Sequence, residues 1–147
     1  MEAAEEYPAV KRGDGYAVAH IDDLGSGPGF RKVRRGLSVT AFGVNALVMP
    51  PGIESGSHYH DVQEELYFVH SGTIEMEFGD GSRETVSAGG FAWVAAPTSR
   101  KIRNAGEDEA VYVIVGGKDG YVGRDGRVPE GEEERVRALH DLRGGEG

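Results

Sequence analysis

Residues 52–72 read GIESGSHYHDVQEELYFVHSG, and this stretch decides the fold. Its first two histidines, His58 and His60, are separated by one residue. Side chains in a β-strand alternate with a period of two, so both imidazoles point to the same face of a strand. A turn around residues 61–63 then lets the chain return and brings Glu65 back beside the imidazoles. Two imidazoles and one carboxylate form a ligand set that leaves coordination positions open for water or substrate.

We therefore predict that His58, His60 and Glu65 are metal ligands. A His-x-His pair by itself is also consistent with two polar side chains on a surface, or with an ordinary hydrogen-bonded pair. Glu64 is an alternative to Glu65, and strand parity does not choose between them, because both faces of the following strand carry bulky residues.

The spacing of this stretch resembles the first motif of the cupin superfamily. That motif reads Gly, five residues, His-x-His, three or four residues, Glu, six residues, Gly. Gly52, the two histidines, Glu65 and Gly72 fit every fixed position and every gap, and the six-residue distance to Gly72 selects Glu65 over Glu64. The resemblance implies an all-β fold, a cupin-type double-stranded β-helix or jelly-roll barrel. It also implies a divalent ion such as Zn, Fe, Mn or Ni.

The second motif of the family is incomplete in this chain. Gly90 (or Gly89), Pro97 and Asn104 match its fixed positions, but the segment from Pro97 to Asn104 is two residues too short. Counting back from Asn104 places the expected histidine at Arg100, and a guanidinium has no lone pair to offer a metal. Three outcomes stay open. Water completes the site, another residue such as His70 substitutes, or the metal site is weak or empty and Arg100 binds an anionic ligand.

A second interpretation of Arg100 is structural, because Arg100, Lys101 and Arg103 also fit a solvated basic rim. Tyr67 and Trp93 are aromatic residues that either line a pocket or fill the core of a barrel. We expect Arg100, Tyr67 and Trp93 to contact a substrate, and the catalytic residues stay unassigned.

The rest of the chain favours a barrel, because segments rich in Val, Ile, Tyr, Phe and Thr alternate with glycine-rich turns. Ile74, Met76 and Phe78 share one strand face, and Asp80-Gly81 predicts a hairpin. We expect strands at residues 16–21, 37–49, 57–60, 65–70, 73–78, 83–86, 91–95 and 111–115, with a short one near 102. A single domain, 1–147, would have its barrel core at about 16–116 and a C-terminal loop and helix at 117–147, the helix over 132–142.

Composition limits the function classes. The chain has 147 residues, no cysteine and a formal charge of −9, which disfavours thiolate metal sites and nucleic-acid binding. The acidic N-terminus and the short apolar runs predict a cytoplasmic protein without a membrane partner. No motif of an α/β-hydrolase or of a nucleotide-binding protein is present.

Three functions remain open. The first is a metal-dependent enzyme, such as an oxygenase, isomerase, decarboxylase or hydrolase, acting on a small oxygenated or anionic molecule. The second is a non-catalytic module that binds or senses a small molecule with weak or no metal. The third is a structural metal site. The resemblance also suggests a homodimer.

Overall fold

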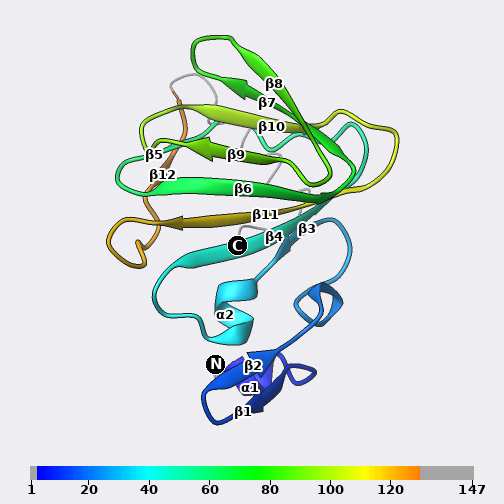
Figure 1. Ribbon diagram of the computed structural model, residues 1–147, viewed down its shortest axis with the longest axis vertical. Coiled ribbons are helices and arrows are strands. Elements are labelled where there is room, and N and C mark those ends of the chain that lie inside the picture. The colour runs from blue at the N-terminus through cyan, green and yellow to red at the C-terminus, as the bar shows by residue number, and fades with distance from the viewer. Residues whose placement is uncertain (1–2, 130–147) are drawn as a thin grey trace.

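The computed structural model describes residues 3–129, and its barrel is built from one five-stranded sheet and two smaller sheets (Figure 1). The larger sheet has five strands in the order β3-β4-β11-β6-β9, and neighbouring strands run antiparallel. Its strands are β3 (Gly29–Arg31), β4 (Gly43–Met49), β11 (Ala110–Gly117), β6 (Glu64–Ser71) and β9 (Phe91–Val94). The all-β prediction is confirmed.

The opposing side is built from two smaller sheets. One has the order β10-β7-β8, with β10 (Arg100–Asn104), β7 (Thr73–Phe78) and β8 (Arg83–Ser87). The other pairs β12 (Gly126–Arg127) with β5 (Tyr59–His60). Two isolated bridges, Glu54 with Arg103 and His58 with Arg100, join the segment before β5 to β10. The histidine pair therefore lies on the wall opposite the five-stranded sheet.

The core lies between these walls and follows the predicted strand parity. Ile74 and Met76 of β7 are fully buried, while Thr73, Glu75 and Glu77 on the other face are partly exposed. The buried cluster takes side chains from most strands: Leu47, Met49, Tyr67, Val69, Ile74, Met76, Val86, Val94, Ile102, Ala110 and Tyr112. The hairpin at Asp80-Gly81 is also confirmed, since β7 pairs with β8 and Gly81 has a φ of +87°.

Asn104 anchors the end of β10. Its side chain is 1% exposed and donates to the carbonyls of Met49 and Asp108, both at 2.8 Å, while its Oδ1 accepts from the Gly106 N–H. This buried amide therefore ties β10 to the end of β4 and to the following turn.

The N-terminal region differs from the sequence-based expectation. Residues before 16, where no element was expected, contain α1 (Ala3–Glu6) and β1 (Lys11–Gly13), and β1 pairs with β2 (Tyr16–Val18). After η1 (Ile21–Asp23) and β3 the chain enters α2 (Val33–Leu37). The strand expected over 37–49 begins only at β4, because α2 precedes it and Ser38 caps that helix with a φ of +62°.

Tyr7, Val10 and Leu24 form a small second core under α2, below the barrel (Figure 1). The helix expected over 132–142 lies outside the described residues. Within residues 3–129, no helix is long and apolar enough to cross a membrane.

Candidate metal centre

The three predicted ligands meet inside the barrel. One donor atom from each of His58, His60 and Glu65 lies within 4.8 Å of the others. The two histidines enter from the β5 wall, with ring centroids 5.4 Å apart, and Glu65 comes from β6 of the opposite sheet. Two nitrogens and a carboxylate oxygen this close can hold one divalent ion.

Asp125 orients the imidazole of His60. The His60 Nδ1 lies 2.8 Å from the Asp125 Oδ1. Burial opposes ionisation of Asp125, but hydrogen bonds from Gln63 and from the Val62 N–H outweigh burial and hold the pKa of Asp125 well below its usual range. An ionised carboxylate only accepts hydrogen bonds, so His60 must donate through Nδ1. The Nε2 of His60 is then left for the metal position.

The free Nε2 of His60 supports this assignment. It is buried, has no hydrogen-bond partner among the described residues, and lies 3.3 Å from Glu65 Oε1. A buried polar atom without a partner is costly, and a bound metal would satisfy it. The donor set of this chain therefore fits a metal ion.

The hydroxyl of Tyr67 holds the Glu65 carboxylate in place. It donates to Glu65 Oε1 at 2.7 Å, and the Tyr67 side chain is fully buried. Burial raises the pKa of Tyr67 well above its usual value, so the phenol stays a donor. For Glu65, burial opposes ionisation, but the neighbouring His60 imidazole and a hydrogen bond from Tyr67 lower its pKa overall. Glu65 is therefore an ionised carboxylate that could serve as an anionic metal ligand.

The two imidazoles differ in protonation. Burial lowers the pKa of His58 to about 4, so this ring is neutral and ready to bind a metal at neutral pH. Burial also disfavours the charged form of His60, but Glu65 and Asp125 outweigh burial and raise the pKa of His60. A metal ion would therefore displace a proton from His60 rather than from His58.

The ligands open onto a cavity of about 530 Å³. His58, His60 and Glu65 share its wall with apolar residues of the five-stranded sheet, including Leu47, Tyr112 and Ile114. Residues 121–128, which follow β11 and contain β12, form another part of the wall. The volume suits a small-molecule ligand.

A family model for the cupin domain matches residues 46–116. That range runs from β4 to β11 and includes all three ligands. The chain belongs to the cupin superfamily. Comparison with curated proteins gave no match.

Solved structures agree with the cupin fold. An uncharacterized conserved protein with a double-stranded β-helix domain from Klebsiella pneumoniae is 23% identical, with a TM-score of 0.61 over 69% of this chain and 90% of that one. A sugar phosphate isomerase from Silicibacter pomeroyi is 23% identical, with a TM-score of 0.56 over 71% and 60%. A DMSP lyase from Ruegeria pomeroyi is 19% identical, with a TM-score of 0.54 over 63% and 46%. This cupin spans less than two thirds of the isomerase and of the lyase.

Arg100 takes the place of the missing histidine in this cupin. It begins β10 and exchanges backbone hydrogen bonds of 2.9 and 2.8 Å with His58. Its side chain is 0% exposed, so the solvated-rim interpretation is wrong. Nη2 donates to the Ala95 carbonyl, whereas Nε and Nη1 have no hydrogen-bond partner within residues 3–129. Arg100 is not part of the cavity wall, so its position does not support direct substrate contact.

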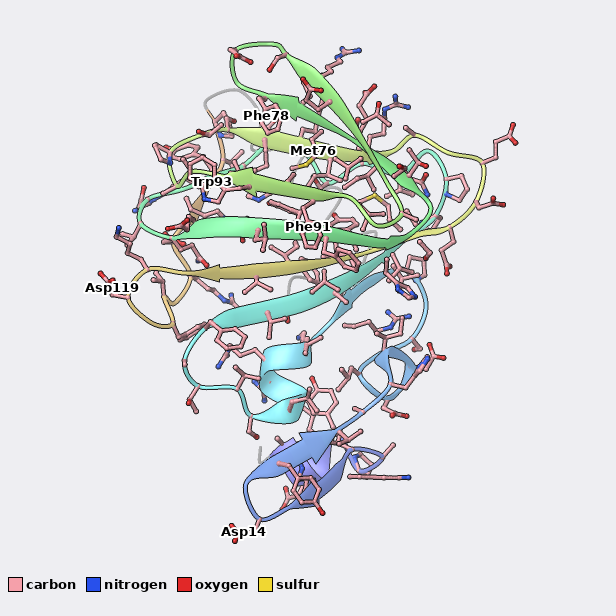
Figure 2. The ribbon with its side chains drawn as sticks, viewed as in Figure 1. Asp14, Met76, Phe78, Phe91, Trp93 and Asp119 are labelled. Carbon is pink, nitrogen blue, oxygen red and sulfur yellow. The ribbon has the colours of Figure 1, made fainter. Side chains whose placement is uncertain are left out.

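The other predicted site residues lie on different faces of their strands: Tyr67 on the inner face, and Trp93 and His70 on the outer face. Tyr67 points inward but lies behind Glu65 rather than on the cavity wall. Trp93 is 63% exposed and its Nε1 donates to Glu64 at 2.7 Å (Figure 2). The expectation of a pocket-lining Trp93 is therefore not supported, because β9 pairs Trp93 with the outward-facing Leu66. His70 is exposed on the same strand face as Leu66, as parity predicts.

Asp125 and Gln63 are site residues that sequence reasoning missed. The sequence predicts a loop at Asp125, and this residue reaches His60 only because β12 pairs with the distant strand β5, with Gly126 opposite His60. Gln63 donates to Asp125 Oδ1 at 2.7 Å from within the turn between His60 and Glu65. The polar pair Arg124-Asp125 stands out within a glycine-rich segment of the sequence. The sequence does not indicate which residue Asp125 contacts.

Proposed function

We propose that this cupin is a metal-dependent enzyme that holds one divalent ion on His58, His60 and Glu65 and acts on a small oxygenated or anionic molecule. The observation that carries the proposal is the convergence of three donor atoms within 4.8 Å at the wall of a cavity. A bound divalent ion would supply Lewis-acid or redox chemistry.

The residues around the ion have separate tasks. Asp125 and Gln63 keep His60 in one orientation, and Tyr67 keeps Glu65 ionised and in place. The apolar wall formed by Leu47, Tyr112 and Ile114 excludes water from one side of the ligand. The reaction class stays open between oxygenation, isomerisation, decarboxylation and hydrolysis.

Elemental analysis of protein purified without a nickel column tests this proposal. We expect about one equivalent of metal in the parent protein and none in His60→Ala, since one of three ligands is lost. His70→Ala is the matched control, because His70 lies on the outer face of β6. Metal-free protein whose thermal stability ignores added divalent ions would overturn the proposal, because a ligand that binds only the folded state raises stability.

A second candidate function is a non-catalytic module that binds a small molecule with weak or no metal. The buried positive charge of Arg100 favours this candidate. Burial is the main cause of the lowered pKa of His58, and the charge of Arg100 lowers it further. The same charge would repel a divalent cation bound beside His58. Turnover of a substrate by metal-loaded protein would separate the enzyme from the binder.

We also propose a homodimer that forms through the outer face of the five-stranded sheet. Leu66 pairs with Trp93 and Phe68 with Phe91 across β6 and β9, and the rings of Phe68 and Phe91 lie 4.8 Å apart. Phe91 and Trp93 are 64% and 63% exposed. Exposed apolar patches often mark interfaces between protein chains.

A further inference from the structure

The wall of the cavity is basic although the chain is acidic. Against a formal charge of −9 for the chain, the wall contains five basic residues and two acidic ones, Glu65 and Asp125. The basic residues are Lys32, Arg34, Arg35, Arg124 and Arg127. A concave site lined by one sign of charge concentrates the potential and attracts ligands of the opposite sign.

Two of these cations are already neutralised. Arg35 Nε lies 2.7 Å from Glu6 Oε2, and Arg127 Nε lies 2.7 Å from Asp61 Oδ2. Neither residue needs an external anion to balance its charge. We therefore assign Arg35 and Arg127 to ion pairs within the protein and not to ligand binding.

Arg124 also takes part in an interaction of its own, which leaves Lys32 and Arg34 available. Within the described part of the chain, no carboxylate forms an ion pair with either residue, although Lys32 acts on Glu6 electrostatically. The Arg34 guanidinium lies 4.2 Å from the ring centroid of Tyr121, another wall residue. A stacked guanidinium is held in orientation while its N–H edge stays free to bind a carboxylate or phosphate through two hydrogen bonds.

The geometry points to a ligand with two different ends. A terminal phosphate binds Lys32 and Arg34, and a hydroxy-carboxylate end reaches the metal centre at His58, His60 and Glu65. This inference rests on the proposed function for its second end only. A volume of about 530 Å³ admits a phosphorylated molecule of a few carbons. Arg100 does not take part, because it is fully buried behind the ligands.

Glycerate and 3-phosphoglycerate form a matched pair of probes, since they share a hydroxy-carboxylate end and differ in the phosphate. Calorimetry on metal-loaded protein should show that 3-phosphoglycerate binds about tenfold tighter or more, because a charge-assisted hydrogen bond has about that effect. Arg34→Gln and Lys32→Gln should each remove most of this preference and leave glycerate binding unchanged. Added salt should also reduce the preference.

The controls separate a local effect from a general loss of charge or fold. Arg83→Gln removes one positive charge on β8, outside the cavity wall, and should keep the full preference. Arg34→Lys keeps the charge and should retain part of it. Equal binding of both probes to metal-loaded protein would overturn this inference and leave the proposed function intact. Protein that takes up no metal would instead overturn the proposed function, and phosphate binding that depends on Arg34 would still support the anion site.

Discussion

Asp125 shows how a single residue outside the ligand set controls it. Its carboxylate accepts hydrogen bonds from His60 Nδ1, from the Gln63 side chain and from the backbone N–H groups of Val62 and Gln63. An amide at this position has only one acceptor oxygen, so several of these donors would lose their partner. The orientation of His60 therefore depends on the charge of Asp125 as well as on its shape.

We expect Asp125→Asn to weaken metal binding by about 10- to 100-fold, the usual effect of losing a partner of a metal-bound histidine. Competition with a metal chelator measures this affinity. Asp119→Asn is the matched control, because Asp119 lies on an exposed turn (Figure 2). Unchanged affinity in Asp125→Asn would show that Asp125 does not position His60.

Arg100 is the second residue whose effect can be measured directly. Replacing it by glutamine removes a buried positive charge beside His58 and His60 while keeping a hydrogen-bonding side chain. We expect Arg100→Gln to bind a divalent metal about tenfold tighter or more, because like charges repel strongly in a low-dielectric interior. The same chelator competition reports the change.

Arg103→Gln provides the comparison for Arg100. Arg103 lies on the same strand, is partly exposed, and pairs with Glu75 at 3.1 Å. We expect its substitution to leave metal affinity unaltered. Weaker metal binding in Arg100→Gln than in the parent protein would mean that Arg100 supports the centre rather than opposing it.

The strands and turns of the barrel follow from local pattern to different degrees. β7 has the predicted bounds, because alternating apolar residues and a hairpin signal on its C-terminal side define it. The helix α2 was not predicted, because a five-residue helix is too short to show a helical period.

The first and last glycines of the motif, Gly52 and Gly72, both have positive φ, +80° and +76°.

These two glycines differ in their surroundings, which gives a stability prediction. A Cβ on Gly72 would lie 2.7 Å from the Glu109 carbonyl oxygen, whereas a Cβ on Gly52 would meet nothing within 4 Å. We expect Gly52→Ala to lower the unfolding free energy by about 1 kcal/mol, from backbone strain alone. Gly72→Ala should cost about 3 kcal/mol, because steric overlap adds to that strain. Urea unfolding curves give both values, and equal losses would contradict the role assigned to close packing at Gly72.

At the scale of the whole molecule, the outer face of β6 and β9 exposes the large apolar side chains of Leu66, Phe91 and Trp93. We expect Phe91→Lys to convert a dimer to a monomer in analytical ultracentrifugation, because it places two charges at the interface of each dimer. Tyr16→Lys is the control, since Tyr16 on β2 is equally exposed at 64% but lies away from that face. A parent protein that sediments as a monomer would exclude the proposed dimer.

Spacing along the chain predicted which three side chains converge in the structure. The period of two aligned His58 with His60, and the distance to Gly72 selected Glu65, so the three ligands could be named before the fold was known. The alignment of the two histidines follows from strand geometry. The choice of Glu65 over Glu64 came from the resemblance to the cupin motif, because strand parity left both open.

The surroundings of the ligands depend on strands that are distant in sequence. Asp125 meets His60 through the pairing of β12 with β5, and Lys32 and Arg34 face the cavity because the chain before β4 folds against the barrel. Arg100 was located by counting, yet its complete burial follows only from the closure of the barrel. Contacts of this kind depend on the register between non-adjacent strands, which no local periodicity encodes.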